Sequence, residues 1–566
     1  MKIALGQVNP IIGDLKGNSA LILKACQEAY QQKADLLITP ELSLWGYPPK
    51  DLLLNSELLK EQWPILQRIV KNIAKKTPGL ILLIGIAEST TDFKSPSLFN
   101  SIVLVDKKGW KVIARKQLLP TYDVFDEKRY FRASDETGQV SIVINEKPWN
   151  IGITICEDIW VKKEIQGHQI EGPDPLSELE KSHIDLLINL SASPFTHRKE
   201  AIRHKLAASA AKRLNCPVAY VNQIGGNDEL IFDGASFVVN EKGKLVLTLP
   251  HCQELISTWD SAANSNEILI SPQDPQETLL EALVLGAKDY SKKCGFKSAL
   301  IGLSGGIDSA LVATIAVAAL GHENVSAVLM PSPWSSMHSV KDAKDLAKRL
   351  CIQTNTIPID PLMKSYDNSL EKALGELPMG LTAENLQARI RGTLLMAIAN
   401  KQEHLLLATG NKSELAVGYC TLYGDMNGGL SVIGDLYKTS VFKLCNWIDS
   451  DAANKCKRIL GLPVSELIGS AIRHKLPSAE LRPGQLDSDS LPEYDTLDAI
   501  LKVLIEKRGS VNELLGQGYE LPLIRKIQKL LKQSEFKRKQ APPMLKVSNQ
   551  AFGSGWRVPI AASYFE

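Results

Sequence analysis

Three residues in the first half of the chain have the side-chain types needed to cleave an amide. Glu41, Lys116 and Cys156 each stand at the end of a short apolar run that is typical of a buried β-strand. A thiolate attacks an amide carbonyl, a carboxylate takes and returns protons, and a cation stabilises the oxyanion. Because strand ends meet at one rim of an α/β sheet, we expect these side chains to lie together. Taken singly, each has a plainer interpretation, since a cysteine in an apolar strand usually only packs the core.

The second half carries a glycine-rich loop between an apolar strand and an apolar helix. Its residues are Gly302, Leu303, Ser304, Gly305, Gly306, Ile307, Asp308 and Ser309. Glycines allow a phosphate to approach the backbone closely, and the start of the helix offers unpaired N–H groups to an anion. A carboxylate at Asp308 would suit a metal that bridges phosphates. This is not a Walker loop, because no Gly-Lys-Ser/Thr follows, and its plainer interpretation is a glycine turn with a helix cap.

Apolar strands alternate with helices in both halves of the sequence. In the first half, strand-like runs such as 184–191 are separated by helical stretches such as 18–33 and 199–214, which predicts a layered α/β fold. In the second half, strand 298–303 leads into a predicted helix at 308–320, and the alternation continues. This pattern predicts a doubly wound, mostly parallel sheet.

Two polar stretches interrupt these patterns. Residues 260–276 are polar and broken by proline, which indicates a linker between two domains. Residues 477–492 are rich in Pro, Ser and Asp, and we interpret them as a mobile loop.

The composition excludes several classes of protein. The chain has 566 residues, 44% hydrophobic and 23% charged, as in an ordinary soluble protein. A net charge of +2 gives no field that would attract nucleic acid or an anionic membrane. Apolar runs of about 18 residues, which a membrane span requires, are not found in the sequence. The nine cysteines are scattered without a C-x-x-C pair, which predicts a reducing compartment, the cytoplasm.

The motifs around the three reactive residues resemble those of the nitrilase, or carbon–nitrogen hydrolase, superfamily. They read P-E-L at Glu41, R-K-x-x-L-P at Lys116 and I-C-E-D-I-W at Cys156. The resemblance implies an αββα sandwich over residues 1–262, with Glu41 as general base, Lys116 as oxyanion stabiliser and Cys156 as nucleophile. It also implies a set of glutamine-binding residues, of which the second also supports the triad: Tyr122, Glu127, Ser193 and Lys199.

The glycine-rich loop resembles the S-G-G-x-D-S loop of the ATP pyrophosphatases, and segments 384–392, 409–414, 423–429 and 535–548 resemble NAD synthetases. This resemblance implies that ATP contacts the loop residues and Thr409. It implies Mg²⁺ at Asp308 and Glu414, and deamido-NAD at Asn385, Arg391, Glu414 and Lys537. One departure is Leu422, because ammonia-only NAD synthetases carry a lysine just before Tyr-Gly-Asp.

Together the halves resemble the bacterial glutamine-dependent NAD synthetases. The resemblance implies a glutaminase domain at 1–262 and a Rossmann-like synthetase domain at 277–566, with glutamine, ATP and deamido-NAD as substrates, Mg²⁺ as cofactor and a homo-oligomeric assembly. Other interpretations stay open: another ATP-pyrophosphatase amidotransferase, an amidase with a degenerate nucleotide module, or a non-catalytic nucleotide-binding protein. The intact loop and Glu414 count against the amidase, and the presence of both sets of reactive residues counts against the non-catalytic protein.

Overall fold

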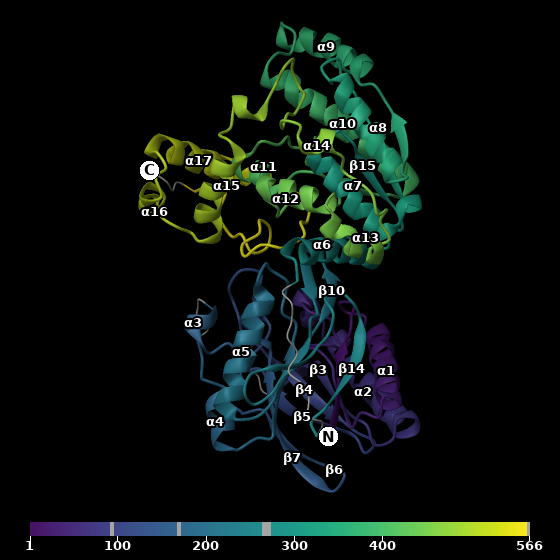
Figure 1. Cartoon of the computed structure of the whole chain (residues 1–566), viewed down its shortest axis with the longest axis vertical. Helices are drawn as coiled ribbons and strands as arrows, with labels where there is room; N and C mark the ends of the chain where they lie inside the picture. The colour runs from purple at the N-terminus through teal and green to yellow at the C-terminus, as the bar shows by residue number, and fades with distance from the viewer. Residues whose placement is uncertain (91–94, 167–170, 263–272, 563–566) are drawn as a thin grey trace. The chain divides into compact units, whose positions relative to one another are not determined.

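A computed structural model describes residues 1–90, 95–166, 171–262 and 273–562 of the chain (Figure 1). The contacts divide it into two compact units, Met1–Gln273 and Asp274–Glu566. Most of the predicted linker, residues 263–272, lies outside the described residues.

The first unit is built on two mixed six-stranded sheets. In spatial order, the first sheet contains β14 (Leu255–Asp260), β1 (Lys2–Gln7), β2 (Leu36–Ile38), β3 (Ile81–Ser89), β4 (Leu98–Val105) and β5 (Trp110–Arg115). The second contains β13 (Leu245–Thr248), β12 (Phe237–Val239), β9 (Val218–Asn222), β8 (Leu186–Ser191), β7 (Lys147–Ile155) and β6 (Gln139–Ile144). The central strands of each sheet, β1–β2–β3 and β7–β8–β9, are parallel. A small hairpin, β10 (Ile224–Asn227) and β11 (Leu230–Asp233), lies outside both sheets.

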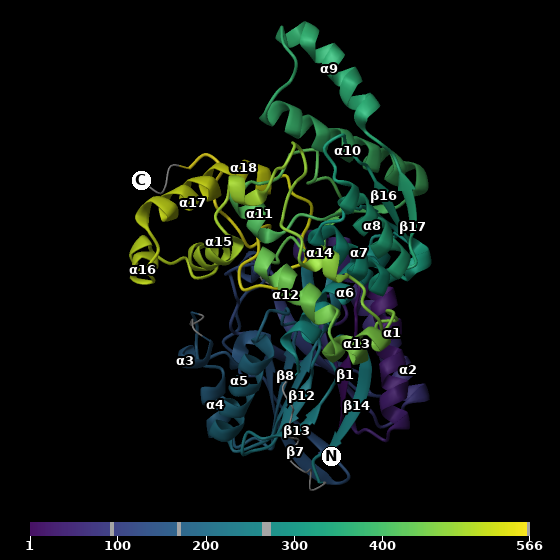
Figure 2. The same cartoon turned by 45° about the horizontal axis from the view of Figure 1, so that its top comes forward.

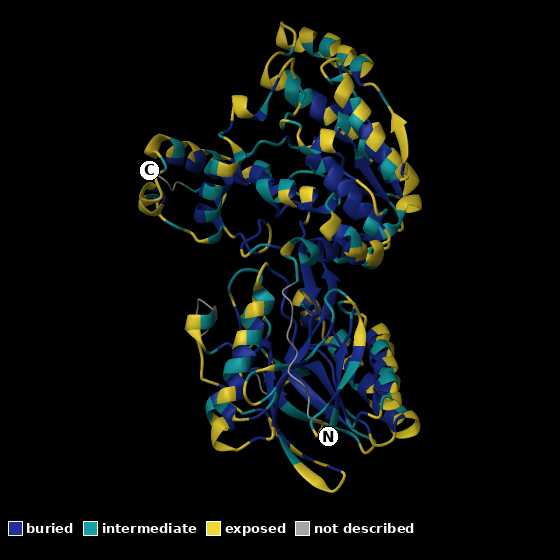
Figure 3. Ribbon diagram, in the orientation of Figure 1, coloured by how far each residue is buried: buried dark blue, intermediate teal, exposed yellow. Residues whose placement is uncertain are grey.

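Among the described residues, hydrophobic cores stack the first unit into four layers, helix–sheet–sheet–helix. The central core joins apolar side chains of both sheets, for example Ile38 of β2 and Ile153 of β7. A second core packs α1 (Leu15–Gln31) and α2 (Ser56–Lys76) on the first sheet, and a third packs α4 (Leu176–Lys181) and α5 (Lys199–Leu214) on the second. Shorter helical turns are η1 (Lys50–Leu54), η2 (Glu127–Arg129), η3 (Cys156–Ile159) and α3 (Lys163–Gln166). The predicted αββα sandwich is confirmed, and Figure 3 shows its strands buried between the helices.

The second unit contains a parallel five-stranded sheet. Its spatial order is β17 (Gln353–Thr356), β16 (Val325–Leu329), β15 (Ala299–Gly302), β18 (Leu405–Ala408) and β19 (Leu430–Ser431). The chain starts in the middle strand, β15, builds toward β17, and then returns to β18 on the other side of β15. The sheet therefore reverses its winding between β15 and β18, which is where ligands bind in doubly wound folds. The predicted doubly wound sheet is confirmed.

Helices cover this sheet and then form an additional helical region. Those between or before the strands are α6 (Pro275–Lys293), α7 (Ile307–Leu320), η4 (His322–Asn324), α8 (Met337–Arg349), α9 (Asp360–Leu374), α10 (Leu381–Gln402) and α11 (Lys412–Val417). Figure 2 shows α9 beside α10. Later elements are α12 (Lys438–Ile448), η5 (Asp451–Ala453), α13 (Asn454–Ile459), α14 (Ser470–Arg473), η6 (Asp487–Asp489), α15 (Tyr494–Leu501), η7 (Lys502–Glu506), α16 (Val511–Gly516), α17 (Leu521–Gln533) and α18 (Glu535–Arg538). Of these elements, α15, η7, α16 and α17 share a core with Phe552 and Trp556.

Some elements were not predicted from the sequence. Helix α2 runs for 21 residues with Pro64 in its interior, and proline normally argues against a helix because it removes a backbone donor. Asn55 caps the start of α2 by accepting hydrogen bonds from Glu57 N and Leu58 N.

Among the described residues, every helix is too short or too polar to cross a membrane.

Candidate active sites

Cys156 occupies a strained backbone position at the rim of the first unit. It follows the last residue of β7, begins η3, and has a φ of 48°. A residue with a side chain rarely adopts this left-handed conformation, and such strain is often found at functional sites. The side chain is buried, with 3% of its surface exposed. Asn189 Nδ2 donates to the Cys156 carbonyl at 3.1 Å, which holds the turn in place.

Glu41 and Lys116 form a buried ion pair. Glu41 follows β2, Lys116 follows β5, and the Lys116 ammonium lies 2.7 Å from Glu41 Oε1. Asn100 Nδ2 donates to the same oxygen at 2.7 Å, and Ala192 N donates to Oε2 at 3.0 Å. Because a carboxylate oxygen accepts about two hydrogen bonds, Oε2 keeps one position for a further donor.

Glu127 places a second carboxylate on the same lysine. Its Oε1 lies 2.8 Å from Lys116 Nζ and accepts a 2.7 Å hydrogen bond from the Tyr47 hydroxyl. Tyr47 is itself buried, with 3% of its surface exposed. Lys116 therefore bridges two carboxylates away from bulk water.

The electrostatics of this cluster favour a neutral thiol before substrate binds. Burial raises the pKa of Cys156 well above its ordinary value, Glu41 raises it further, and Lys116 opposes both. Burial would lower the pKa of Lys116, but Glu127 and Glu41 outweigh it and keep the ammonium charged. Burial raises the pKa of Glu127 to about 7, against the pull of Lys116. A base is thus needed to deprotonate the thiol, and Glu41 is close enough to influence its pKa.

The other residues expected near glutamine come from three further segments. The hydroxyl of Tyr122 donates to Glu157 Oε1, beside the nucleophile. The ammonium of Lys199, at the start of α5, lies 4.5 Å from the ring centroid of Trp160. Ser193 follows β8 and is buried.

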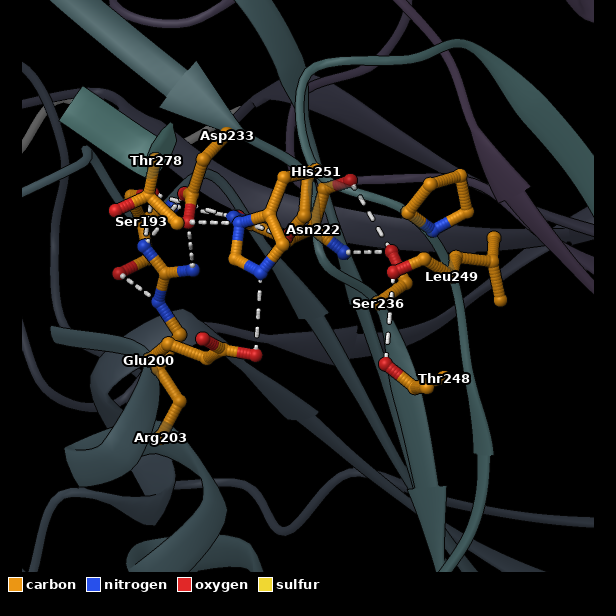
Figure 4. A network of polar contacts seen from close by, with 12 residues as sticks. Ser193, Glu200, Arg203, Asn222, Asp233, Ser236, Thr248, Leu249, His251 and Thr278 are labelled. Carbon is orange, nitrogen blue, oxygen red and sulfur yellow. Dashed lines mark hydrogen bonds and ion pairs between the residues drawn. The ribbon is translucent and has the colours of Figure 1, made fainter. Parts of the chain in front are cut away.

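An ionic network holds Ser193 (Figure 4). Arg203 Nε donates to Ser193 Oγ at 3.2 Å, and Arg203 Nη2 donates to the Ser193 carbonyl at 3.1 Å. Both terminal nitrogens of Arg203 also bond Asp233, at 3.1 and 2.8 Å, and His251 joins Asp233 to Glu200. Burial would raise the pKa of Asp233, but Arg203 and His251 lower it to about 2. The segment that positions Ser193 is therefore tied to a charged, buried cluster.

In the second unit, the glycine-rich loop joins β15 to α7 at the reversal point of the sheet. Gly305 has a φ of +79°, and a Cβ there would lie 2.2 Å from the Ser339 carbonyl oxygen, so only glycine fits. Gly306 caps α7 without a side-chain hydrogen bond from any described residue, which leaves N–H groups at the helix start for an anion. The Ser304 and Ser309 hydroxyls lie 3.1 Å apart in the same turn.

Asp308 and Glu414 meet at a shared lysine that the sequence did not indicate. Lys438 Nζ, at the start of α12, lies 2.5 Å from Asp308 Oδ2 and 3.1 Å from Glu414 Oε1. Asn411 Nδ2 donates to Asp308 Oδ1 at 3.0 Å, and Asn411 also caps α11, which carries Glu414. Burial raises the pKa of Glu414 to about 8 although Lys438 lowers it, and Asp308 raises it further. Thr409 directly follows β18 at the same rim.

The residues expected near deamido-NAD lie in two groups around this rim. Asn385 of α10 accepts a hydrogen bond from the Thr421 hydroxyl at 2.8 Å. Lys537 of α18 donates to the Gly418 and Cys420 carbonyls at 2.8 and 2.7 Å, so it reaches the same loop. Arg391 instead donates to the Met330 carbonyl at 3.1 Å, beyond the end of β16. Burial lowers the pKa of Arg391 to about 10.

Comparisons with known proteins match both units. The family described as carbon-nitrogen hydrolase matches residues 2–263, and the family described as NAD synthase matches residues 279–541. A glutamine-dependent NAD(+) synthetase of Synechocystis sp. is 49% identical over 570 residues, covering 99% of this chain and 99% of the relative. That of Thermotoga maritima is 38% identical, covering 100% and 99%. The chain belongs to the glutamine-dependent NAD(+) synthetase family.

Solved structures agree with this membership. The glutamine-dependent NAD+ synthetase of Acinetobacter baumannii, in complex with adenosine diphosphate, is 34% identical and matches with a TM-score of 0.74, covering 99% of this chain and 98% of that one. The Cytophaga hutchinsonii glutamine-dependent NAD(+) synthetase matches with a TM-score of 0.80, at 22% identity over 100% and 98% of the chains, and supports the fold.

Several groups that contact the predicted site residues were not predicted from the sequence. Lys438 begins a helix in the sequence Y-K-T-S, with no strand end or glycine turn to mark it. Asn100 lies inside β4, where an isolated asparagine is usually interpreted as a strand residue. Tyr47 lies in the same loop after β2 as Glu41. This closeness in sequence to Glu41 is the one local signal that could have indicated its place in the site.

Proposed function

We propose that this chain converts deamido-NAD (nicotinic acid adenine dinucleotide) to NAD, using ATP for activation and glutamine as the source of ammonia. The observation that carries the proposal is the presence of two chemically different sites in one chain. One has a buried carboxylate–lysine pair near a strained cysteine, and the other has two carboxylates beside an anion-binding loop. The first set of groups suits amide cleavage, and the second suits ATP-dependent activation of a carboxylate.

At the first site, Cys156 passes its proton to Glu41 as its sulfur attacks the side-chain carbonyl carbon of glutamine. Oε2 of Glu41 suits this role, because Oε1 already accepts from Lys116 and Asn100. The charge that develops on the carbonyl oxygen is stabilised by the Lys116 ammonium. Glu41 then returns the proton to the leaving nitrogen, which departs as ammonia. Water hydrolyses the remaining glutamyl thioester to glutamate and restores the thiol.

At the second site, the nicotinate carboxylate of deamido-NAD attacks the α-phosphorus of ATP, and diphosphate leaves. The N–H groups at the start of α7 and the hydroxyls of Ser304 and Ser309 are suited to hold the phosphates. Ammonia then attacks the carbonyl carbon of the adenylate. AMP leaves, and loss of a proton gives the amide of NAD.

We assign Asp308 and Glu414 to the Mg²⁺ that accompanies ATP. The donor set fits, because hard cations prefer carboxylate oxygens and both carboxylates now share a single ammonium, that of Lys438. Such a cation, when bound, would neutralise charge on the phosphates of the leaving diphosphate. Asn411 would keep Asp308 oriented through its 3.0 Å hydrogen bond.

We assign the remaining predicted residues to substrate binding. Glutamine would contact Tyr122, Glu127, Ser193 and Lys199, ATP would contact residues 302–309 and Thr409, and deamido-NAD would contact Asn385, Arg391, Glu414 and Lys537. Asn385 and Lys537 both contact the loop that contains Gly418 and Thr421. This supports the assignment of these two residues to the same ligand.

The proposal extends to the organisation of the protein. The glutaminase domain would span 1–262 and the synthetase domain 277–566, which is compatible with the two compact units. All nine cysteines are free thiols, which is compatible with activity in the cytoplasm. The homo-oligomeric assembly stays a prediction, and light scattering with the purified chain tests it.

The deciding experiment measures NAD formation from deamido-NAD, ATP and Mg²⁺, with glutamine or an ammonium salt supplied in parallel. Formation of NAD, AMP and diphosphate with glutamine supports both halves of the proposal. Activity with ammonium alone would remove the glutaminase assignment of Cys156. Absence of NAD with both nitrogen sources, together with glutamine hydrolysis, would favour an amidase with a degenerate nucleotide module.

A further inference from the structure

Asp158 is a buried carboxylate that the steps above do not use. It lies in η3, two residues after Cys156, and only 3% of its surface is exposed. Its Oδ2 accepts a hydrogen bond from Ile155 N at 2.9 Å. Its Oδ1 accepts two more, from Gln117 N at 3.1 Å and Leu118 N at 2.8 Å.

These three backbone donors lie at the ends of the two strands that the reacting groups follow, one within β7 and two just after β5. Ile155 is the last residue of β7, in the second sheet, and directly precedes Cys156. Gln117 and Leu118 directly follow Lys116, which leaves β5 in the first sheet. One carboxylate therefore joins the two sheets of the sandwich at the points where the nucleophile and the lysine leave them.

We propose that Asp158 is a positioning residue that sets the Cys156 sulfur relative to the Lys116 ammonium. The inference rests on the proposed glutaminase function of this site. A carboxylate suits the role because both of its oxygens accept hydrogen bonds and all three partners are backbone N–H donors. An amide at this position would place its own NH₂ donor against the N–H groups on one side. Hydrogen bonds to a charged acceptor are also stronger than neutral ones.

The burial of Asp158 agrees with a role that depends on its charge. Burial raises the pKa of Asp158 to about 6, while the hydrogen bonds from Leu118 and Ile155 lower it. The hydrogen bonds from these donors therefore favour the ionised carboxylate against the effect of burial. Because the buried carboxylate accepts hydrogen bonds from the backbone of both segments, a shift of its position would move the backbone beside Cys156 and beside Lys116.

The test is Asp158→Asn in the full chain, with Asp185→Asn as a matched control. Asp185 is exposed and accepts a 2.8 Å hydrogen bond from Asn150 N near the other end of β7, so the control removes a similar bond far from Cys156. A displacement of about 1 Å between reacting groups costs about a hundredfold in rate. We therefore expect kcat for glutamine hydrolysis to fall about a hundredfold in Asp158→Asn with little change in KM.

Two further readouts separate positioning from a general loss of structure. The rate at which iodoacetamide modifies Cys156, followed by mass spectrometry of its peptide, should change in Asp158→Asn and stay the same in the control. Ammonium-dependent NAD formation should be unchanged in both variants. If Asp158→Asn does not fold, Asp158→Glu keeps the charge and shifts the carboxylate, and it should show the same loss of kcat.

A folded variant with unchanged kcat and unchanged Cys156 modification would overturn the inference. A rise in KM with unchanged kcat would also overturn it, since that result would place Asp158 in substrate binding. The proposed function is tested separately by the wild-type protein. If wild type does not hydrolyse glutamine at all, the proposed function is contradicted whatever the variants show.

Discussion

The two candidate sites share one device, a lysine between two carboxylates, but they differ in how completely it is enclosed. Lys116 lies 2.7 Å from Glu41 and 2.8 Å from Glu127, whose side chains are 0% and 5% exposed. Lys438 lies 2.5 Å from Asp308 and 3.1 Å from Glu414, whose side chains are 17% and 16% exposed. The first cluster is closed and the second is partly open.

This difference matches the chemistry proposed for each site. The Glu41 carboxylate accepts from three groups on separate segments, so its orientation is fixed before a small substrate arrives. Preorganised charges of this kind favour transfer of a proton and stabilisation of an oxyanion. The open carboxylates of the second site keep oxygens accessible, as a polyphosphate with its cation requires.

The largest effect should come from Cys156→Ala. NAD formation with glutamine should fall by at least about a thousandfold, because the thioester can no longer form. NAD formation with ammonium salt should be retained, because the second site is untouched. The measurement is NAD produced with each nitrogen source, and Cys216→Ala, a buried cysteine outside the site, serves as control. If ammonium does not rescue Cys156→Ala, the division of labour between the two sites is wrong.

Asp308→Ala should produce the opposite pattern. Synthesis should fall by about a hundredfold or more with either nitrogen source, since a charged group at the phosphates is lost. Glutamine hydrolysis should persist at the first site. The exposed Asp345, on α8 of the same unit, gives the control variant Asp345→Ala. Normal synthesis in Asp308→Ala would remove Asp308 from the proposed cation site.

The parts of the fold and site that could be predicted are those that the local sequence specifies. Cys156 directly follows β7 and Lys116 directly follows β5, so the ends of these strands marked both residues, although the two strands belong to different sheets. The glycine-rich loop was predictable for the same reason, because strand, turn and helix follow one another within a few residues. The alternation of strands and helices predicted a layered α/β fold in the first half and a doubly wound sheet in the second, whereas the αββα sandwich followed from the resemblance to the nitrilase superfamily.

The parts that could not be predicted depend on contacts between distant segments. Asn100 and Ala192 reach Glu41 across 59 and 151 residues of chain, and neither carries a local signal. Lys438 reaches Asp308 across 130 residues. Each of these contacts follows from which strands become neighbours in the sheets, and a strand pattern alone does not fix that order.

Removing each lysine in turn sharpens the comparison between closed and open clusters. Lys116→Met leaves two enclosed carboxylates without their cation, which should cost about 3–5 kcal/mol. Lys438→Met should cost less, because water can reach Asp308 and Glu414. Thermal unfolding of both variants measures this, with Lys288→Met, an exposed lysine of α6, as control. MgCl₂ should raise the melting temperature of Lys438→Met more than that of Lys116→Met, and equal responses would contradict the open–closed distinction.

The smallest effect concerns the network around Ser193, where charge supports structure without taking part in the reaction. Burial would lower the pKa of His251, but Asp233 and Glu200 raise it from 6.5 to about 10. A group whose pKa is raised on folding stabilises the folded state fully below its unfolded pKa, and this contribution is lost as pH rises through the folded value. His251 should therefore stabilise the first unit most below pH 6.5 and progressively less toward pH 10. The side chain that replaces it in His251→Gln is neutral at every pH and lacks this contribution. The difference in melting temperature between wild type and His251→Gln should therefore shrink from pH 6.5 to pH 10.

The comparison of His251→Gln with His183→Gln isolates the network, because His183 is exposed in the same unit. Lysines and tyrosines that titrate in the same range affect wild type and variant equally, so they cancel in the difference. A difference of melting temperatures that stays constant from pH 6.5 to 10 would mean that His251 is not charged in the folded state. Its proximity to Asp233 would then be only a packing contact, and Arg203 alone would hold the segment that carries Ser193.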